Sequence, residues 1–300
     1  MTGSARKGFW QRAGPVALKH KFIRDIFMFC YTAGETEKDA LRMACALYKW
    51  GGCGVISDLL GEEVTERAVA ETAARKYIAH AKKLGALKVL YSDFRCALAI
   101  KLSQLGLKFD LDLARGLLKD IFEEAIFYDV GLEIDMEGSE TLIPALNVIR
   151  ALIRASPHFR IATAANQSPS DRYLAFCRNH GAGVRVVKGA YEGDLAPGKD
   201  TDLNFIRLTE EALASGLDTA IGTHDEKIIK LFPEVTLQML LGVRPFARKD
   251  FIYMPWGEER ANYLKRRWDE GVRSNAANLF VINIPEAILW RVLYARQVTV

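Results

Sequence analysis

Short apolar runs rich in β-branched residues alternate with longer amphipathic stretches along most of this chain. Eight of these runs are predicted to be strands, at 53–59, 96–102, 131–136, 159–164, 184–189, 217–222, 235–240 and 250–254. Helical periodicity marks the stretches between and after them, at 64–84, 109–128, 139–156, 169–180, 202–215 and 258–270. Strands that alternate with helices are typical of parallel sheets, so the pattern predicts an α/β fold.

Eight strand-helix units within about 250 residues favour a closed (β/α)8 barrel of the TIM type over an open doubly wound sheet. A dinucleotide-binding sheet would also need a glycine-rich turn after its first strand, and the residues GVISDLLGEE at 54–63 lack that spacing. We therefore expect one barrel domain over residues 31–300. Helix 34–50 would precede its strands, and helix 283–295 would close it.

Composition narrows the class of function. The net charge of +4 gives no strong reason to expect a nucleic acid partner, and no apolar run reaches the length of a membrane span. Five widely spaced cysteines without a C-x-x-C pair argue against a disulfide framework or a zinc site and for a reducing compartment. We expect residues 1–30 to form a basic arm, which is either a transit peptide or a solvated segment that contacts anionic lipid.

Polar side chains gather at the carboxyl ends of the predicted strands, where a barrel carries its catalytic groups. They are Asp58, Glu62, Lys101, Asp135, Arg185, Lys188, Thr223, His224, Asp225, Gln238 and Tyr253. Lys101 and Asp135 interrupt runs that otherwise read as buried, where an unpaired charge costs several kcal/mol. A solitary ion pair that fixes strand register would explain any one of them. So many strands that end this way favour a site.

Helix 258–270 carries four polar residues on one face, because Tyr263, Arg266, Arg267 and Glu270 follow the i, i+3, i+4, i+7 spacing. Two guanidinium groups could hold a small carboxylate, with Glu270 orienting one of them. The alternative is a solvated face in which the Arg266–Glu270 pair contributes a few tenths of a kcal/mol.

His224 could be a base, a ligand or a capping residue. A metal site is disfavoured because no second histidine lies at metal-ligand spacing.

Nine segments in register resemble the FAD-dependent proline dehydrogenase family in its monofunctional form. They are YTAGET (31–36), SDLLGE (57–62), IKLSQLG (100–106), EIDMEGS (133–139), VRVVKGAY (184–191), IGTHDEKII (221–229), LQMLLG (237–242), IYMPWG (252–257) and YLKRRWDE (263–270). The resemblance implies a distorted barrel with FAD across the strand ends. It also implies oxidation of L-proline to 1-pyrroline-5-carboxylate by hydride transfer from C5 to flavin N5, with a quinone as electron acceptor.

The resemblance also implies roles for individual residues. Those that meet FAD would be Thr163, Arg185, Lys188, Gly189, Ala190, Tyr191, Thr223, His224 and Gln238. Those that meet or position proline would be Glu62, Lys101, Asp135, Leu240, Tyr253, Tyr263, Arg266, Arg267 and Glu270. Among these, Arg266, Arg267 and Lys101 would hold the carboxylate. A glycine at 189 would allow the backbone to approach the cofactor closely.

Departures from the family pattern keep other functions open. Thr163 stands where relatives have a flavin-contacting glutamine, with Gln167 nearby, and RRWDE replaces the usual RRLAE. Hydroxyproline or pipecolate would be alternative substrates, and a silent barrel that serves as a binding subunit would be a non-enzymatic alternative. We expect a cytoplasmic protein or one at the periphery of the inner membrane, and a mitochondrial one only if the basic segment is a transit peptide.

Overall fold

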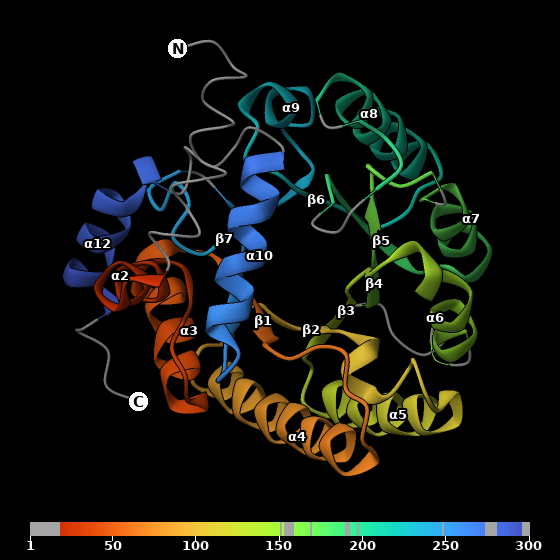
Figure 1. Cartoon of the computed structure of the whole chain (residues 1–300), viewed down its shortest axis with the longest axis horizontal. Coiled ribbons are helices and arrows are strands. Elements are labelled where there is room, and N and C mark those ends of the chain that lie inside the picture. Colours follow the sequence, from red (N-terminus) through yellow and green to blue (C-terminus); the bar gives the residue numbers. More distant parts are fainter. Residues whose placement is uncertain are drawn as a thin grey trace.

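Eight parallel strands close into a barrel in chain order, with β8 paired to β1 (Figure 1). The computed structural model describes residues 19–150, 152, 159–168, 170–189, 193–196, 198–247, 249–273 and 281–295, and only the backbone of 270–273. The strands are β1 Gly54–Leu59, β2 Cys96–Ile100, β3 Gly131–Ile134, β4 Phe159–Ala164, β5 Gly183–Val187, β6 Thr219–Gly222, β7 Thr236–Leu240 and β8 Phe251–Trp256. The predicted (β/α)8 barrel is confirmed.

Helices surround the barrel (Figure 1). They are α2 Lys21–Tyr31, α3 Glu37–Gly51, α4 Arg67–Leu90, α5 Leu111–Phe127, α6 Leu142–Ile149, α7 Ser170–His180, α8 Lys199–Ala214, α9 Glu226–Leu231, α10 Arg260–Arg273 and α12 Ile284–Leu293, with 3₁₀ turns at Leu102–Leu105 and Ser139–Thr141. The sequence did not predict α9, because its 6 residues are too few to show a helical period.

Helix α3 covers the outer face of β1 and β8. It begins in a capping box, in which the Thr36 hydroxyl accepts from the Asp39 N–H and the Asp39 carboxylate accepts from the Thr36 N–H. It ends at Gly52, which adopts the left-handed conformation. In a regular barrel, the helix after the last strand would cover this face. Because α3 takes that place, the helix after β8 lies elsewhere.

Helix α10 lies over the opening of the barrel. Figure 1 draws it in front of the strands, and its residue Tyr263 packs in one apolar cluster with Leu60, which follows β1, and Leu240, which ends β7. Helix α2 contacts both α10 and α12. The carboxyl ends of the strands therefore face a helix that carries several of the predicted site residues.

The segment expected as a basic arm is in part a packed helix. Residues 21–31 form α2, whose Phe27, Cys30 and Tyr31 are buried against α10 and α12. The strong amphipathic pattern of KFIRDIFMFCY explains the difference, since its apolar residues share one face. Helix α12 confirms the predicted closing helix.

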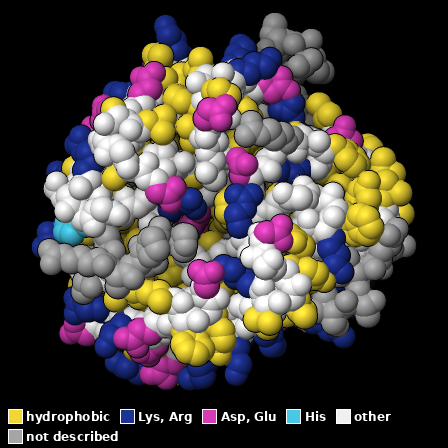
Figure 2. Space-filling model, turned by 180° about the vertical axis from the view of Figure 1, so that it is seen from behind, with side chains coloured by type: hydrophobic (Ala, Val, Ile, Leu, Met, Phe, Trp, Pro, Cys, Tyr) yellow, Lys and Arg dark blue, Asp and Glu magenta, His cyan; other side chains and the backbone are white. Residues whose placement is uncertain are grey.

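Charged side chains of both signs lie on the face opposite to the view of Figure 1. Figure 2, seen from the side opposite to Figure 1, shows lysine and arginine interspersed with aspartate and glutamate around the centre of the molecule. Arg160, near the start of β4, pairs with Asp218, which precedes β6, at 2.9 Å. The five cysteines are buried and unpaired: Cys30, Cys45, Cys53, Cys96 and Cys177. Among the described residues, no helix is long and apolar enough to cross a membrane.

Candidate active site at the barrel mouth

A buried lysine lies between two carboxylates near the carboxyl ends of the first three strands. Lys101 follows β2 and is 5% exposed, and its Nζ donates to Asp58 on β1. Asp135, which follows β3, lies 3.8 Å from the same nitrogen. Lys101 therefore has two carboxylate partners. This pairing is expected, because an isolated buried charge is costly.

Arg185 on β5 extends this cluster across the interior. Its guanidinium donates to Glu133 at 2.9 Å and to Asp135, and it lies 5.2 Å from the centre of the Tyr253 ring. The Tyr253 hydroxyl donates to Asp135 as well. Asp135 is therefore held by a lysine that follows β2, an arginine on β5 and a phenol on β8.

Glu133 was not among the predicted site residues, yet it joins three side chains inside the barrel. It is 1% exposed and accepts from Arg160 at 3.1 Å, from Arg185 at 2.9 Å and from Gln238 at 2.7 Å. Its position could have been inferred from that of Asp135, because residues 133 and 135 are two apart in a strand and therefore share one face. Asp58, noted at a strand end but given no role, is the direct partner of Lys101.

The electrostatics keep Lys101 and Asp135 ionised. Burial alone would lower the pKa of Lys101, but the carboxylates of Asp58, Asp135 and Glu62 outweigh that effect and raise it. Burial alone would raise the pKa of Asp135, but Arg185, Lys101 and the Tyr253 hydrogen bond hold it below its usual range. Lys101 is therefore a fixed positive charge at neutral pH and not a base.

Helix α10 brings its cations to this mouth. Arg266 pairs with Glu62, in the loop after β1, at 2.7 Å. The guanidinium of Arg267 lies 5.4 Å from the centre of the Tyr263 ring, which is buried. Of the four predicted residues of this face, Glu270 has a side chain outside the described part of the structure.

Four strands present buried polar atoms that have no hydrogen-bond partner within the described chain. They are Thr163 Oγ1 on β4, Arg185 Nε on β5, His224 Nδ1 after β6 and Gln238 Oε1 on β7. Buried polar groups normally find partners, so an unpartnered set on adjacent strands fits a polar ligand. The residues present therefore fit a cofactor that both donates and accepts hydrogen bonds. Gln167 Oε1 is also buried and without a hydrogen-bond partner among the residues described.

His224 is held neutral at the end of β6. Its Nε2 accepts from the Leu240 N–H at 3.2 Å, which leaves the proton on Nδ1. Burial, with smaller contributions from Arg244, Arg267 and Lys249, lowers its pKa to about 3. At neutral pH the imidazole is therefore a hydrogen-bond donor through Nδ1. Thr223 next to it is buried, and its hydroxyl accepts from the Asp225 N–H at 3.1 Å.

The pKa of His224 predicts a pH effect on stability. Because the folded-state pKa lies below the unfolded value of about 6.5, the unfolded chain binds the proton first and wild type loses stability as the pH falls below that value. In His224→Gln this loss is absent. We expect the difference in free energy of unfolding between wild type and variant to narrow from pH 7 to pH 5, as measured by urea unfolding. A constant difference would contradict the assignment, and His180→Gln is the control.

In the loop after β5, two of the residues predicted to bind the cofactor contact other residues of the chain. Lys188 Nζ pairs with Asp202 at 2.6 Å and with Asp225 at 3.0 Å. Gly189 has φ +111°, and a Cβ there would overlap with the Asn166 side chain. The close approach predicted at this glycine is therefore made to Asn166 in this structure. Ala190 and Tyr191, the next predicted residues, lie outside the described part of the chain.

Gly189→Ala is accordingly expected to destabilise the fold. The substitution combines a left-handed φ with an overlap, whereas Gly216, at φ +69°, has open space where a Cβ would lie. We expect Gly189→Ala to lower the free energy of unfolding by about 2 kcal/mol more than Gly216→Ala, measured by urea unfolding. Equal effects would show that Asn166 moves aside freely.

Comparison with known proteins relates this geometry to a family. Proline dehydrogenase 1 of Bacillus subtilis subsp. natto is 29% identical over 260 residues, which cover 79% of this chain and 84% of that protein. Proline dehydrogenase of Deinococcus radiodurans is 28% identical over 276 residues, which cover 82% and 86%. The chain is thus similar to proline dehydrogenases over most of its length. No family model matches it.

Solved structures share the barrel fold of this chain. Proline utilization A from Bdellovibrio bacteriovorus superposes with a TM-score of 0.72 at 18% identity and covers 89% of this chain. The match spans 35% of that longer protein. Proline utilization A from Bradyrhizobium japonicum superposes with a TM-score of 0.67 at 21% identity. That match covers 90% of this chain and 34% of the Bradyrhizobium protein. At these identities the likeness shows the barrel fold alone.

Proposed function

We propose that this chain oxidises L-proline to 1-pyrroline-5-carboxylate, the first step of proline catabolism, with FAD as cofactor and a quinone as electron acceptor. One observation carries the proposal: α10 places Arg266 and Tyr263 over the strand ends that hold Lys101, Asp135 and Tyr253. The choice of proline as substrate rests on the similar proteins, which are named proline dehydrogenases. Contact with the periphery of a membrane, where a quinone would be met, belongs to the same proposal.

The proline site would be built from α10 and the mouth of the barrel. Arg266 and Arg267 would bind the carboxylate, because guanidinium groups offer paired donors in a plane. Lys101 would add a fixed positive charge nearby. Tyr263 and Leu240, which pack in one cluster, would cover the ring and exclude water. The far side of the ring, which includes C5, would then point into the barrel mouth.

The cofactor site would use the unpartnered atoms of Thr163, Arg185, His224 and Gln238. When bound there, FAD supplies the hydride acceptor. The chain contributes position and charge: Glu133 and Asp135 fix the Arg185 guanidinium, and Glu133 also orients the Gln238 amide. Thr163 is shorter than the glutamine of relatives, so Gln238 and His224 would carry more of the hydrogen bonding on this side.

The proposal is tested by turnover. Protein purified with added FAD is expected to retain flavin and to reduce a dye acceptor when L-proline is supplied. Parallel assays with hydroxyproline and pipecolate determine the substrate. Turnover of one of these and none of proline would overturn the substrate assignment. Failure to retain any flavin would overturn the cofactor assignment, and flavin retention without turnover of any cyclic amine would favour a binding subunit.

A further inference from the structure

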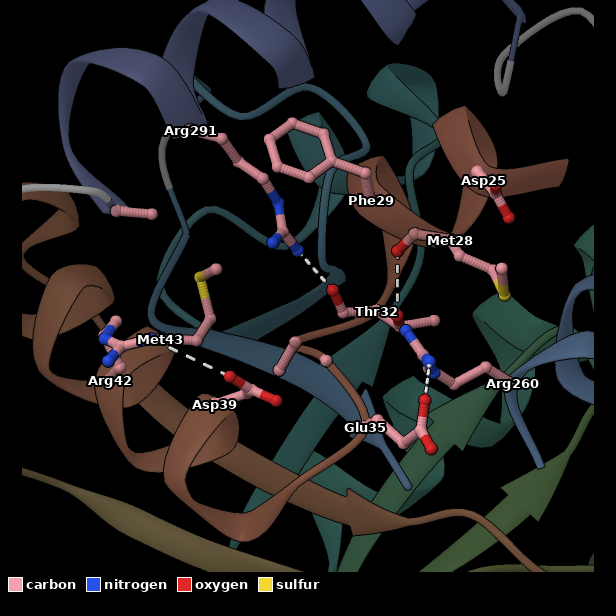
Figure 3. A pocket seen from close by; sticks show the side chains of 13 residues that line it. Asp25, Met28, Phe29, Thr32, Glu35, Asp39, Arg42, Met43, Arg260 and Arg291 are labelled. Atoms are coloured by element: carbon pink, nitrogen blue, oxygen red, sulfur yellow. Dashed lines mark hydrogen bonds and ion pairs between the residues drawn. The ribbon is translucent and has the colours of Figure 1, made fainter. Parts of the chain in front are cut away.

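A pocket of about 960 Å³ lies outside the barrel, lined by residues of α2, α3, the start of α10 and the end of α12 (Figure 3). Its apolar wall includes Met28, Phe29 and Met43, and three arginines also line it: Arg42, Arg260 and Arg291. None of these residues belongs to the candidate site at the barrel mouth. The size of the pocket is in the range of small-molecule sites.

Two of the three arginines have acidic partners in the pocket wall. Arg260 pairs with Glu35, and Arg42 lies 3.7 Å from Asp39. Figure 3 shows the Arg260–Glu35 bond and, on the other side of the pocket, Arg291 directed toward Thr32 beside the ring of Phe29. The charges of these two pairs cancel locally.

Arg291 differs from them. It is 7% exposed, and no carboxylate among the described residues lies within ion-pair distance of it. One Nη donates to the Thr32 carbonyl, and the guanidinium lies 5.0 Å from the centre of the Phe29 ring. Its Nε has no hydrogen-bond partner in the part of the chain that the structure describes. Burial lowers its pKa to about 10, so it remains charged at neutral pH. A buried charge without a counterion is costly, and an anion would relieve that cost.

We propose that this pocket binds a small carboxylic acid with an apolar body, whose carboxylate pairs with Arg291. The apolar body would pack against Met28, Phe29 and Met43. A dianion such as phosphate fits less well, because Arg260 and Arg42 are already paired with Glu35 and Asp39, so that Arg291 offers only one positive charge for a ligand to neutralise. The ligand class is therefore an organic monoanion, bound at a place separate from the proline site.

The probe for this site is 4-fluorobenzoate, followed by fluorine NMR. The protein is the FAD-loaded chain carrying Arg266→Met, which removes a carboxylate-binding group from the barrel mouth. We expect saturable binding of one equivalent. The neutral 4-fluorobenzamide is expected to bind at least tenfold more weakly, and inorganic phosphate is expected not to displace the probe.

A negative charge introduced into the pocket lining tests whether the probe binds in this pocket or elsewhere on the protein. Arg291 also holds the Thr32 carbonyl, so its replacement could disturb folding. Phe29→Glu instead changes a side chain that is 37% exposed and places a carboxylate beside the guanidinium. We expect it to weaken binding of the probe at least tenfold. Phe22→Glu, on the same helix, 76% exposed and outside the pocket lining, is the control and should bind as before.

Three outcomes would overturn the inference. They are no saturable binding of 4-fluorobenzoate, equal binding of the amide, and equal affinities of the Phe29→Glu and Phe22→Glu variants. Displacement of the probe by inorganic phosphate would contradict the assignment to a monoanion. Each of these results is independent of whether the barrel mouth oxidises proline.

Discussion

Replacing Arg266 by Met is expected to reduce kcat/KM for L-proline by at least about thirtyfold. Removal of one partner from a charged, hydrogen-bonded pair typically costs about 2–5 kcal/mol, and each 1.4 kcal/mol is a factor of ten. The fold should persist, because the Arg266 side chain is 39% exposed and its partner, Glu62, lies in a loop. Steady-state kinetics with a dye acceptor give the ratio, and thermal unfolding shows whether the variant is folded.

The control for this prediction is Arg115→Met on α5. Arg115 also pairs with a carboxylate, that of Asp112, but both lie on an exposed helix surface. The kcat/KM of Arg115→Met for L-proline should equal that of wild type. An unchanged kcat/KM in Arg266→Met would remove the carboxylate-binding role from this arginine.

Replacing Lys101 by Met is expected to lower the free energy of unfolding by about 3–5 kcal/mol at neutral pH. The variant leaves Asp58 and Asp135 without the cation that lies between them. Without it, burial of Asp135 is opposed by fewer charges and the folded-state pKa of this carboxyl rises relative to wild type, so protonation at acid pH costs the variant less stability than it costs wild type. The deficit relative to wild type should therefore shrink as the pH falls from 8 to about 4. Urea unfolding at several pH values measures it.

Lys108→Met provides the comparison. Lys108 pairs with Glu63 and lies 3.8 Å from Glu140, but its side chain is 36% exposed. A surface pair of this kind contributes about 0–1 kcal/mol. A Lys101→Met deficit as small as this, or one that does not change with pH, would contradict the buried cluster as described.

The architecture could be predicted from the sequence because each layer leaves a local signal. All eight strands fall within a few residues of the predicted runs, since buried parallel strands read as continuous apolar segments. The position of α10 over the mouth had no such signal. It depends on α3 occupying the outer face of β1 and β8, which is a contact between distant parts of the chain.

The candidate site could be predicted in part for the same reason. Lys101 and Asp135 were noticed because a charge in an apolar run needs a partner, and both are paired. Glu133 escaped notice because its three partners come from β4, β5 and β7, and only the closed barrel brings them together. Gly189 was expected to let the backbone approach a cofactor, and in the structure the Asn166 side chain lies against it. Sequence spacing does not reveal this contact.

The most direct test of the account is the absorbance spectrum of the purified, FAD-loaded protein before and after L-proline is added without oxygen. If the cations of α10 present proline to a cofactor at the strand ends, the yellow absorbance of the flavin bleaches on addition of proline, and Arg266→Met bleaches far more slowly. A flavin-loaded protein whose spectrum proline leaves unchanged would contradict the account.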